Sequence, residues 1–128
     1  MILGMGNDLV DVRRVRRALE RNGDRMLHRL FTAGERQAAQ EHKDLGLYVA
    51  SRFAAKEAAA KALGTGIHQG VRFRDLEVVR PPGCRPELHL HGGAADHGRR
   101  LGVQRSHLSL SDEGDYALAT VILEGGQT

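Results

Sequence analysis

Residues 52–66 read RFAAKEAAAKALGTG, and this stretch decides the fold that the sequence predicts. Alanine has the highest helix propensity, so the run predicts the C-terminal part of a long helix over about residues 47–63. With 3.6 residues per turn, Glu57 and Lys61 lie on one face of that helix. The helix should stop at Gly64, because glycine readily adopts the left-handed conformation that closes a helix.

Glu57 and Lys61 allow two interpretations. A pair of opposite charges at i, i+4 is common on solvated helices and stabilises a helix by only about 0.2–0.5 kcal/mol. Alternatively, a carboxylate and an ammonium group ahead of a glycine loop form a metal and phosphate site, in which Gly64 and Gly66 let a ligand approach the backbone. Spacing alone favours the first interpretation, so residues outside the helix must decide.

The residues before the central helix predict one strand followed by helices. Residues 2–8 are apolar and glycine-spaced, which predicts a short strand that ends at Asp8, where the chain turns into a helix. In that helix Val12, Val15 and Leu19 recur at the spacing of one buried stripe. Two further short helices are expected, one begun by Asp24 and ending at Leu30 after the stop signal Asn22-Gly23, and one begun by the capping box of Thr32 and Glu35.

Two pairs of strands are expected after the central helix. Residues 75–80 and 87–91 alternate between apolar and polar side chains around a proline-glycine turn, which predicts a hairpin. Residues 107–111 and 116–123 form a second pair around a turn. Because helices cluster before strands, we expect an α+β fold with an antiparallel sheet packed on the long central helix. The length of the chain predicts a single domain over residues 1–128.

The composition favours a reducing compartment. The only cysteine is Cys84, which lies in a proline-rich turn, so no disulfide framework is expected. The N-terminus shows no basic leader, and no segment approaches the roughly 18 apolar residues that a membrane span needs. We therefore expect a cytoplasmic protein that has no association with a membrane.

The charge of the chain is concentrated near its start. Residues 13–36 hold eight arginines against three acidic residues, whereas the rest of the chain has eleven basic and thirteen acidic residues. Arg14, Arg17 and Arg21 share one helix face, and this pattern favours docking of an acidic partner. Aromatic residues are only 4% of the chain and tryptophan is absent, which argues against a nucleic-acid surface built on base stacking.

Asp8 and Glu57 are the side chains best suited to a metal ion. Mg²⁺ typically takes one or two carboxylates, several waters and phosphate oxygens, although an aspartate at a strand end is often only a helix cap. His89 and His91 lack cysteine or acidic partners at zinc-binding spacing. His107 precedes a serine-rich strand, but residue order alone gives no Ser-His-Asp arrangement.

Three segments together resemble a known enzyme family. They read GNDLVDVRR at residues 6–14, RFAAKEAAAKALGTGI at residues 52–67, and HLSLSDE at residues 107–113 followed by YALATV at residues 116–121. Their order and spacing are similar to the motifs of holo-acyl-carrier-protein synthases, the short bacterial type of 4'-phosphopantetheinyl transferase. The resemblance implies Mg²⁺-dependent transfer of the phosphopantetheine arm of coenzyme A to a serine of apo acyl carrier protein, in support of fatty acid biosynthesis. It also implies release of adenosine 3',5'-bisphosphate and a homotrimer with active sites at subunit interfaces.

The resemblance also assigns roles to individual residues. Asp8 and Glu57 are implied to hold the metal ion, and Lys61 is implied to act beside the leaving phosphate, so these three are the expected catalytic residues. The coenzyme is expected to contact Arg52, Lys61, Gly64, Gly66 and His107. Lys56 and Arg52 are expected either to contact the phosphates of the coenzyme or to stabilise the trimer. The acidic carrier is expected to dock on Arg14, Arg17, Arg21 and Arg25.

Some alternatives stay open at this point. The proton of the carrier serine is accepted either by a metal-bound water or by a carboxylate of the metal pair, and the sequence does not choose between them. The arginine-rich helix is also compatible with a small polyanion-binding protein without catalysis, and a third possibility is a structural trimer that lacks activity. Glu57 and the acidic remainder of the chain argue against the polyanion-binding alternative.

Overall fold

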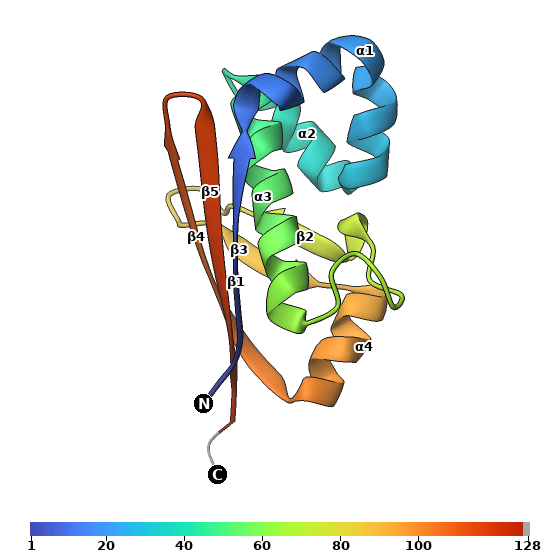
Figure 1. Ribbon diagram of the computed structural model, residues 1–128, viewed down its shortest axis with the longest axis vertical. Helices are drawn as coiled ribbons and strands as arrows, with labels where there is room; N and C mark the ends of the chain where they lie inside the picture. Colours follow the sequence, from blue (N-terminus) through green and yellow to red (C-terminus); the bar gives the residue numbers. More distant parts are fainter. Residues whose placement is uncertain (127–128) are drawn as a thin grey trace.

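The computed structural model describes residues 1–126 and has an α+β architecture, as predicted (Figure 1). One antiparallel sheet has the strand order β1 (Ile2–Asp11), β5 (Tyr116–Gly125), β4 (Val103–Glu113), and a second sheet pairs β2 (Leu76–Val79) with β3 (Glu87–Leu90). The helices are α1 (Val12–Leu30), α2 (Ala33–Glu41), α3 (Leu45–Leu63), α4 (Gly92–Leu101) and the 3₁₀ helix η1 (Phe73–Asp75).

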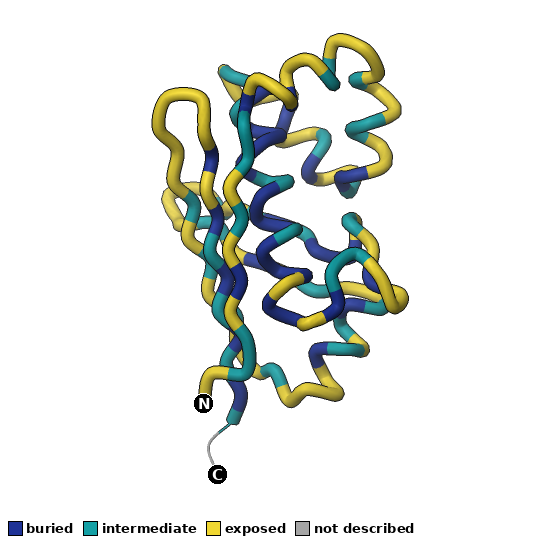
Figure 2. The backbone as a smooth tube through the Cα atoms, in the orientation of Figure 1, coloured by how far each residue is buried: buried dark blue, intermediate teal, exposed yellow. Residues whose placement is uncertain are grey.

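Helix α3 is the central element, and it is buried on nearly all sides (Figure 2). Six alanines between residues 50 and 60 have no exposed surface, so the run that predicted the helix also builds the core. Small side chains allow β1 and β5 to pack closely against it, and β5 contributes alternate inward residues such as Ala119 and Val121. The predicted packing of an antiparallel sheet on a long helix is confirmed. The helix starts at Leu45, two residues earlier than predicted, because Asp44 caps it by accepting a hydrogen bond from Leu47 N at 3.1 Å.

Strand β1 is longer than the sequence predicted. It continues to Asp11, because β5 pairs with it along its length, up to Tyr116 opposite Asp11. Asp8 therefore lies inside the strand, opposite Ala119, and the prediction that it ends the strand is wrong. Asp11 is the helix cap instead, since its Oδ1 accepts a hydrogen bond from Arg13 N at 2.9 Å. This difference frees the Asp8 carboxylate for another role.

Helix α1 joins two segments that the sequence predicted as separate helices. Asn22, with φ −148° and ψ 45°, interrupts the helical backbone, so the predicted stop at this residue is a kink. The next helix begins as predicted, with a capping box in which Thr32 and Glu35 exchange hydrogen bonds. The kink turns the second half of α1 back along α2 (Figure 1).

Both predicted strand pairs are confirmed. In the β2–β3 hairpin Val78 lies opposite Leu88, and in the β4–β5 pair Leu108 lies opposite Val121. Strands β4 and β5 belong to the three-stranded sheet that covers α3, with β4 at the edge far from β1. Within residues 1–126 no helix combines the length and the apolar character needed to cross a membrane.

Candidate active site

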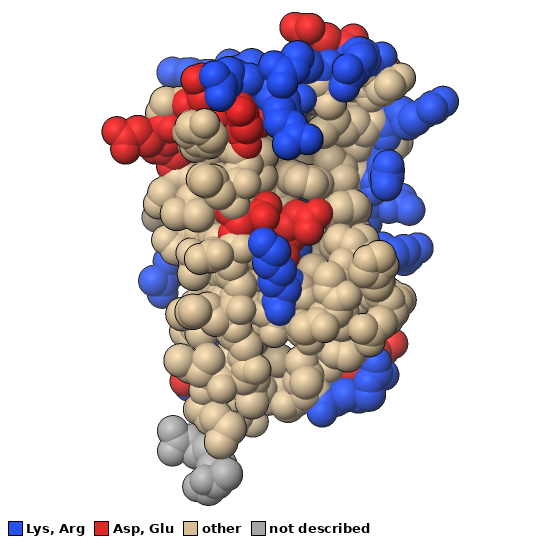
Figure 3. All heavy atoms as spheres, in the orientation of Figure 1, with Lys and Arg blue, Asp and Glu red and all other residues tan. Residues whose placement is uncertain are grey.

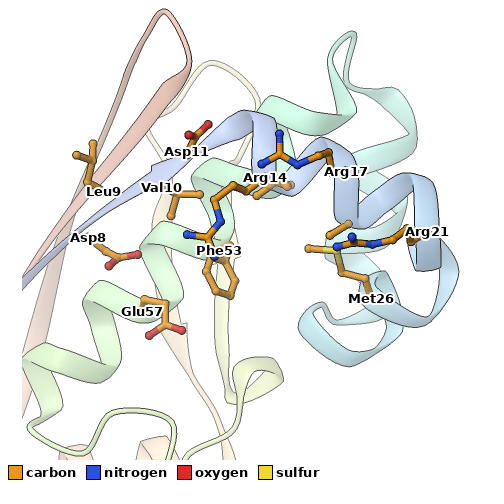
Figure 4. Close-up of a pocket in the computed structure, with 12 residues that line it drawn as sticks. Asp8, Leu9, Val10, Asp11, Arg14, Arg17, Arg21, Met26, Phe53 and Glu57 are labelled. Atoms are coloured by element: carbon orange, nitrogen blue, oxygen red, sulfur yellow. The ribbon is translucent and has the colours of Figure 1, made fainter.

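A cavity of about 550 Å³ opens between β1, α1 and α3 (Figure 4). Asp8 enters it from β1 and Glu57 from α3, and Phe53 covers the wall between them and α1. The structure thus brings together two carboxylates that lie 49 positions apart in the sequence. In the space-filling view, acidic atoms occupy the middle of this face, below a band of basic atoms over α1 (Figure 3).

Lys61 joins the two elements beside this cavity. Its Nζ donates a hydrogen bond to the backbone carbonyl of Asn7 at 2.9 Å and forms an ion pair with Asp8 Oδ1 at 3.1 Å. The ammonium group therefore reaches across to β1, and the interpretation of Lys61 as half of an isolated helical pair does not describe it. About half of the Lys61 side chain is exposed, which leaves the cation accessible to a ligand.

The carboxylates of Asp8 and Glu57 favour a cation at their end of the cavity. Burial raises the pKa of Glu57 above its usual value, the nearby Asp8 carboxylate raises it further, and Lys61 lowers it. Two carboxylates that face one cavity repel each other, and a metal ion between them would relieve that repulsion. Their hard oxygen atoms suit Mg²⁺. Within residues 1–126 no three His, Cys, Asp or Glu side chains gather to hold a metal, so water and phosphate oxygens would complete the coordination.

The arginines of α1 divide into two groups. Arg13 bonds Asp11 at 2.9 Å and Arg16 bonds Asp44 at 2.9 Å, so these two guanidinium groups stabilise the fold. Arg16 thereby lowers the pKa of Asp44 to about 2. The predicted docking residues instead face the cavities: Arg14, Arg17 and Arg21 line the cavity of Asp8 and Glu57, while Arg21 and Arg25 line a neighbouring one that includes Arg29, Met26 and Phe73.

Arg52 and His107 lie away from this cavity. Arg52 lines a separate hollow of about 470 Å³ between α3, the β2–β3 hairpin and β4, together with Arg80 and Arg85. Its guanidinium carbon lies 4.4 Å from the ring centre of Tyr48, burial lowers its pKa, and its buried Nε has no hydrogen-bond partner among the described residues. His107 lies on β4, where its Nε2 is 2.9 Å from Glu124 Oε1. A single chain therefore does not bring these two predicted coenzyme contacts to Asp8.

Lys56 has a structural role, and the prediction that it contacts phosphates is wrong. Its side chain is completely buried and donates hydrogen bonds to Glu35 Oε1 at 2.9 Å and to the carbonyls of Phe73 at 3.0 Å and Leu76 at 2.7 Å. Three acceptors satisfy the ammonium group inside the core. Burial lowers the pKa of Lys56, and the Glu35 carboxylate opposes that shift.

The glycines after α3 end the helix as predicted. Gly64 has φ 81° and its N–H bonds the carbonyls of Ala60 and Lys61. Gly66 has φ 61°, also in the left-handed region. Both follow the helical turn that carries Lys61, outside the residues that line the Asp8 cavity. Their contact with a coenzyme stays a prediction.

Comparison with known proteins identifies the family. Residues 4–121 match the model of the 4'-phosphopantetheinyl transferase superfamily. The chain belongs to this superfamily. A holo-[acyl-carrier-protein] synthase of Methylorubrum extorquens is 52% identical over 97% of this chain and 94% of the relative. The crystal structure of the enzyme of that name from Neisseria meningitidis superposes with a TM-score of 0.90 at 36% identity, covering 97% of this chain and 99% of the other.

The predicted enzyme class, a phosphopantetheinyl transferase, is thereby confirmed. A Helicobacter pylori holo-[acyl-carrier-protein] synthase solved in complex with coenzyme A has a TM-score of 0.83 and 26% identity, covering 94% of this chain and 99% of the other. In this transferase the apolar walls beside the arginines are formed by Met26, Phe53 and Phe73, which no sequence pattern indicated. Arg80 and Arg85 share the hollow of Arg52, although their positions in a turn gave no indication of this.

Proposed function

We propose that this transferase moves the 4'-phosphopantetheine group of coenzyme A to a serine of apo acyl carrier protein and releases adenosine 3',5'-bisphosphate, in support of fatty acid biosynthesis. The observation that carries the proposal is the meeting of Asp8 and Glu57 at one cavity, with Lys61 paired to Asp8 beside it. Two carboxylates and an accessible cation are a set suited to phosphoryl transfer, which depends on positioning and on stabilising charge at phosphate oxygens. The names of the relatives support the same reaction.

Asp8 and Glu57 are the residues that would hold Mg²⁺. When bound there, the ion supplies charge neutralisation at the pyrophosphate oxygens of the coenzyme. Lys61 lies beside the cavity with an exposed ammonium group, which can leave Asp8 and bind a phosphate oxygen of the leaving nucleotide. A carboxylate of this pair, or a water molecule held beside it, would accept the proton of the carrier serine.

The arginine face of α1 is the docking surface for the carrier in this proposal. Arg14, Arg17 and Arg21 line the same cavity as the two carboxylates, so an acidic partner held there presents its serine next to the reacting phosphate. Arg25 extends the basic surface to the neighbouring cavity, where Phe53 and Phe73 add an apolar contact. Such charges mainly accelerate and orient the encounter with an acidic protein.

A homotrimer would bring the separated groups together. Asp8 lies on β1 and His107 on β4, at opposite edges of a three-stranded sheet and roughly 10 Å of strand spacing apart. If the β1 edge of one subunit meets the β4 edge of the next, each site gains the partner's coenzyme contacts at Arg52 and His107. Three such head-to-tail contacts close a ring. Exposed apolar side chains of the sheet, among them Met5, Leu9 and Leu118, supply a surface for this contact.

One assay tests the proposed reaction. The chain is incubated with apo carrier protein, coenzyme A and Mg²⁺, and the carrier is weighed by mass spectrometry. We expect a phosphopantetheine adduct, which Asp8→Ala and Glu57→Ala should abolish without loss of the folded state. Glu41→Ala is a matched control, because this exposed glutamate at the end of α2 lies outside the cavity. A folded wild-type chain that yields no adduct would refute the proposal. We further propose the cytoplasm as the site of action, consistent with the single free cysteine.

A further inference from the structure

At Gly4 and Gly6, strand β1 meets helix α3 with no side chain of the strand between them. Gly4 and Gly6 face the helix, on the same side of the strand as Asp8, because strand residues alternate between faces. A Cβ atom on Gly6 would lie 2.1 Å from the carbonyl oxygen of Ala58 and 2.9 Å from Lys61 Cβ. A Cβ atom on Gly4 would lie 2.0 Å from the carbonyl oxygen of Ala62. Backbone atoms cannot rotate away, so any side chain would separate the two elements.

The place of Gly6 relates this contact to the site. It precedes Asp8 by two residues, which is roughly 7 Å along a strand. On the helix it touches the turn from Ala58 to Lys61, which directly follows Glu57. Gly4 makes an equally close contact, but it lies twice as far from Asp8 along the strand. The two glycines therefore impose the same steric limit at different distances from the carboxylates.

We propose that Gly6 is a positioning residue, whose missing side chain sets the separation of Asp8 from Glu57 and Lys61 at the value required to share one divalent cation. The inference rests on the metal site of the proposed function. Mg²⁺ demands near-ideal geometry with short bonds to oxygen, so ligands from two elements must be placed to within roughly 0.5 Å. A close backbone contact between the two elements supplies that precision.

The contacts of Lys61 agree with this assignment. Its Nζ bonds both the carbonyl of Asn7 and the carboxylate of Asp8, which are the two residues that follow Gly6. Only a strand that runs close to the helix allows one ammonium group at the helix surface to reach both oxygen atoms. The Asp8 side chain, 19% exposed, continues the line of Gly4 and Gly6 at the point where the cavity begins.

Gly6→Ala and Gly4→Ala form a matched pair for the test. The nearest contacts are similar, 2.1 Å at Gly6 and 2.0 Å at Gly4, so both variants should lower the melting temperature. Mn²⁺ affinity, measured by isothermal titration calorimetry without coenzyme or carrier, separates them. We expect Gly6→Ala to weaken Mn²⁺ binding by roughly 10- to 100-fold, the usual loss when a residue that orients metal ligands is changed. The affinity of Gly4→Ala should stay within about threefold of the wild-type affinity. Equal losses in both variants, or wild-type affinity in Gly6→Ala, would overturn the inference.

A longer carboxylate provides the second measurement. Asp8→Glu in the wild-type background should bind Mn²⁺ more weakly, because the separation is set for aspartate. In the Gly6→Ala background the same change should recover at least part of the lost affinity, since the added methylene spans the widened gap. If Gly6→Ala does not fold, Asp8→Glu alone decides, and wild-type affinity in that variant would refute the role of Gly6. A wild-type chain that shows no saturable Mn²⁺ binding would instead refute the proposed metal site itself.

Discussion

At the scale of single residues, Glu57 combines a functional role with a cost to stability. Its folded-state pKa lies above its unfolded value, so the ionised carboxylate destabilises the fold. This destabilisation is complete above the folded-state pKa and vanishes below the unfolded value. Glu57→Gln should therefore raise the melting temperature of the metal-free chain by about 1–4 °C at neutral pH. At about pH 4 the melting temperatures of the variant and the wild type should be equal.

Differential scanning fluorimetry with a chelator measures this effect. Glu41→Gln removes an equal charge from an exposed position and should leave the melting temperature nearly unchanged at both pH values. Added Mn²⁺ should then stabilise the wild type and leave Glu57→Gln unaffected, because only ligand binding to the folded state shifts the transition. A lower melting temperature for Glu57→Gln without metal would contradict the cost of burying the Glu57 carboxylate beside Asp8.

Single residues also show how far the sequence could predict the site. Glu57 and Lys61 were recognisable as a pair, because helical spacing fixes their relative direction. The pairing of Lys56 with Glu35 was not recognisable from the sequence. Their contact spans 21 positions and depends on how α2 packs on α3, and no local pattern encodes that packing. Asp8 was assigned correctly to β1 but was misplaced at its end, because strand length depends on the partner strand.

At the scale of elements, α1 is the part of the molecule that should determine recognition of the carrier. Arg14→Glu combined with Arg21→Glu reverses two exposed charges at the cavity rim. We expect the KM for apo carrier protein to rise about tenfold, because the loss of two exposed charge pairs weakens binding by about that factor. The KM for coenzyme A should stay within about twofold of the wild-type value. The difference should shrink with added salt, because screening weakens attraction between exposed charges.

Steady-state kinetics with each substrate varied in turn separates the two effects. Arg99→Glu is a suitable control, because it makes one of the same charge changes on α4, where the side chain is 70% exposed and does not line the cavities of α1. It should leave both KM values unchanged. An unaltered carrier KM in the double variant would show that the carrier docks elsewhere.

The elements themselves were largely predictable, and their exact bounds were not. The alanine run, the capping box of Thr32 and the proline-glycine turn each carry a local signal, and each is found where expected. The sequence predicts a helix end at Asn22, where the structure has a kink. Local propensity cannot show that the helix packs on α2 and α3 and continues beyond this residue. Tertiary contacts thus corrected the bounds and left the order of elements intact.

At the scale of the whole molecule, the two edges of the sheet carry complementary halves of the proposed site. Asp8 lies on the β1 edge, beside Glu57 and Lys61 of α3, and His107 lies on the β4 edge, in a hollow that it shares with Arg85. In the proposed trimer, neither group of residues suffices alone. An assembly that joins unlike edges would satisfy both, with a mass three times the 14.0 kDa of one chain.

Mixed trimers test this arrangement. Glu57→Gln and Arg52→Ala should each be nearly inactive alone, because each damages a different half of every site. Refolding the two variants together in equal amounts pairs the halves at random, so about a quarter of the sites regain both intact residues. Carrier modification followed by mass spectrometry should then recover to about a quarter of the wild-type rate. A mixture of Glu57→Gln with Asp8→Ala should recover none, since both changes fall in the same half. Equal recovery in the two mixtures, or none in the first, would show that the sites do not combine residues from two subunits.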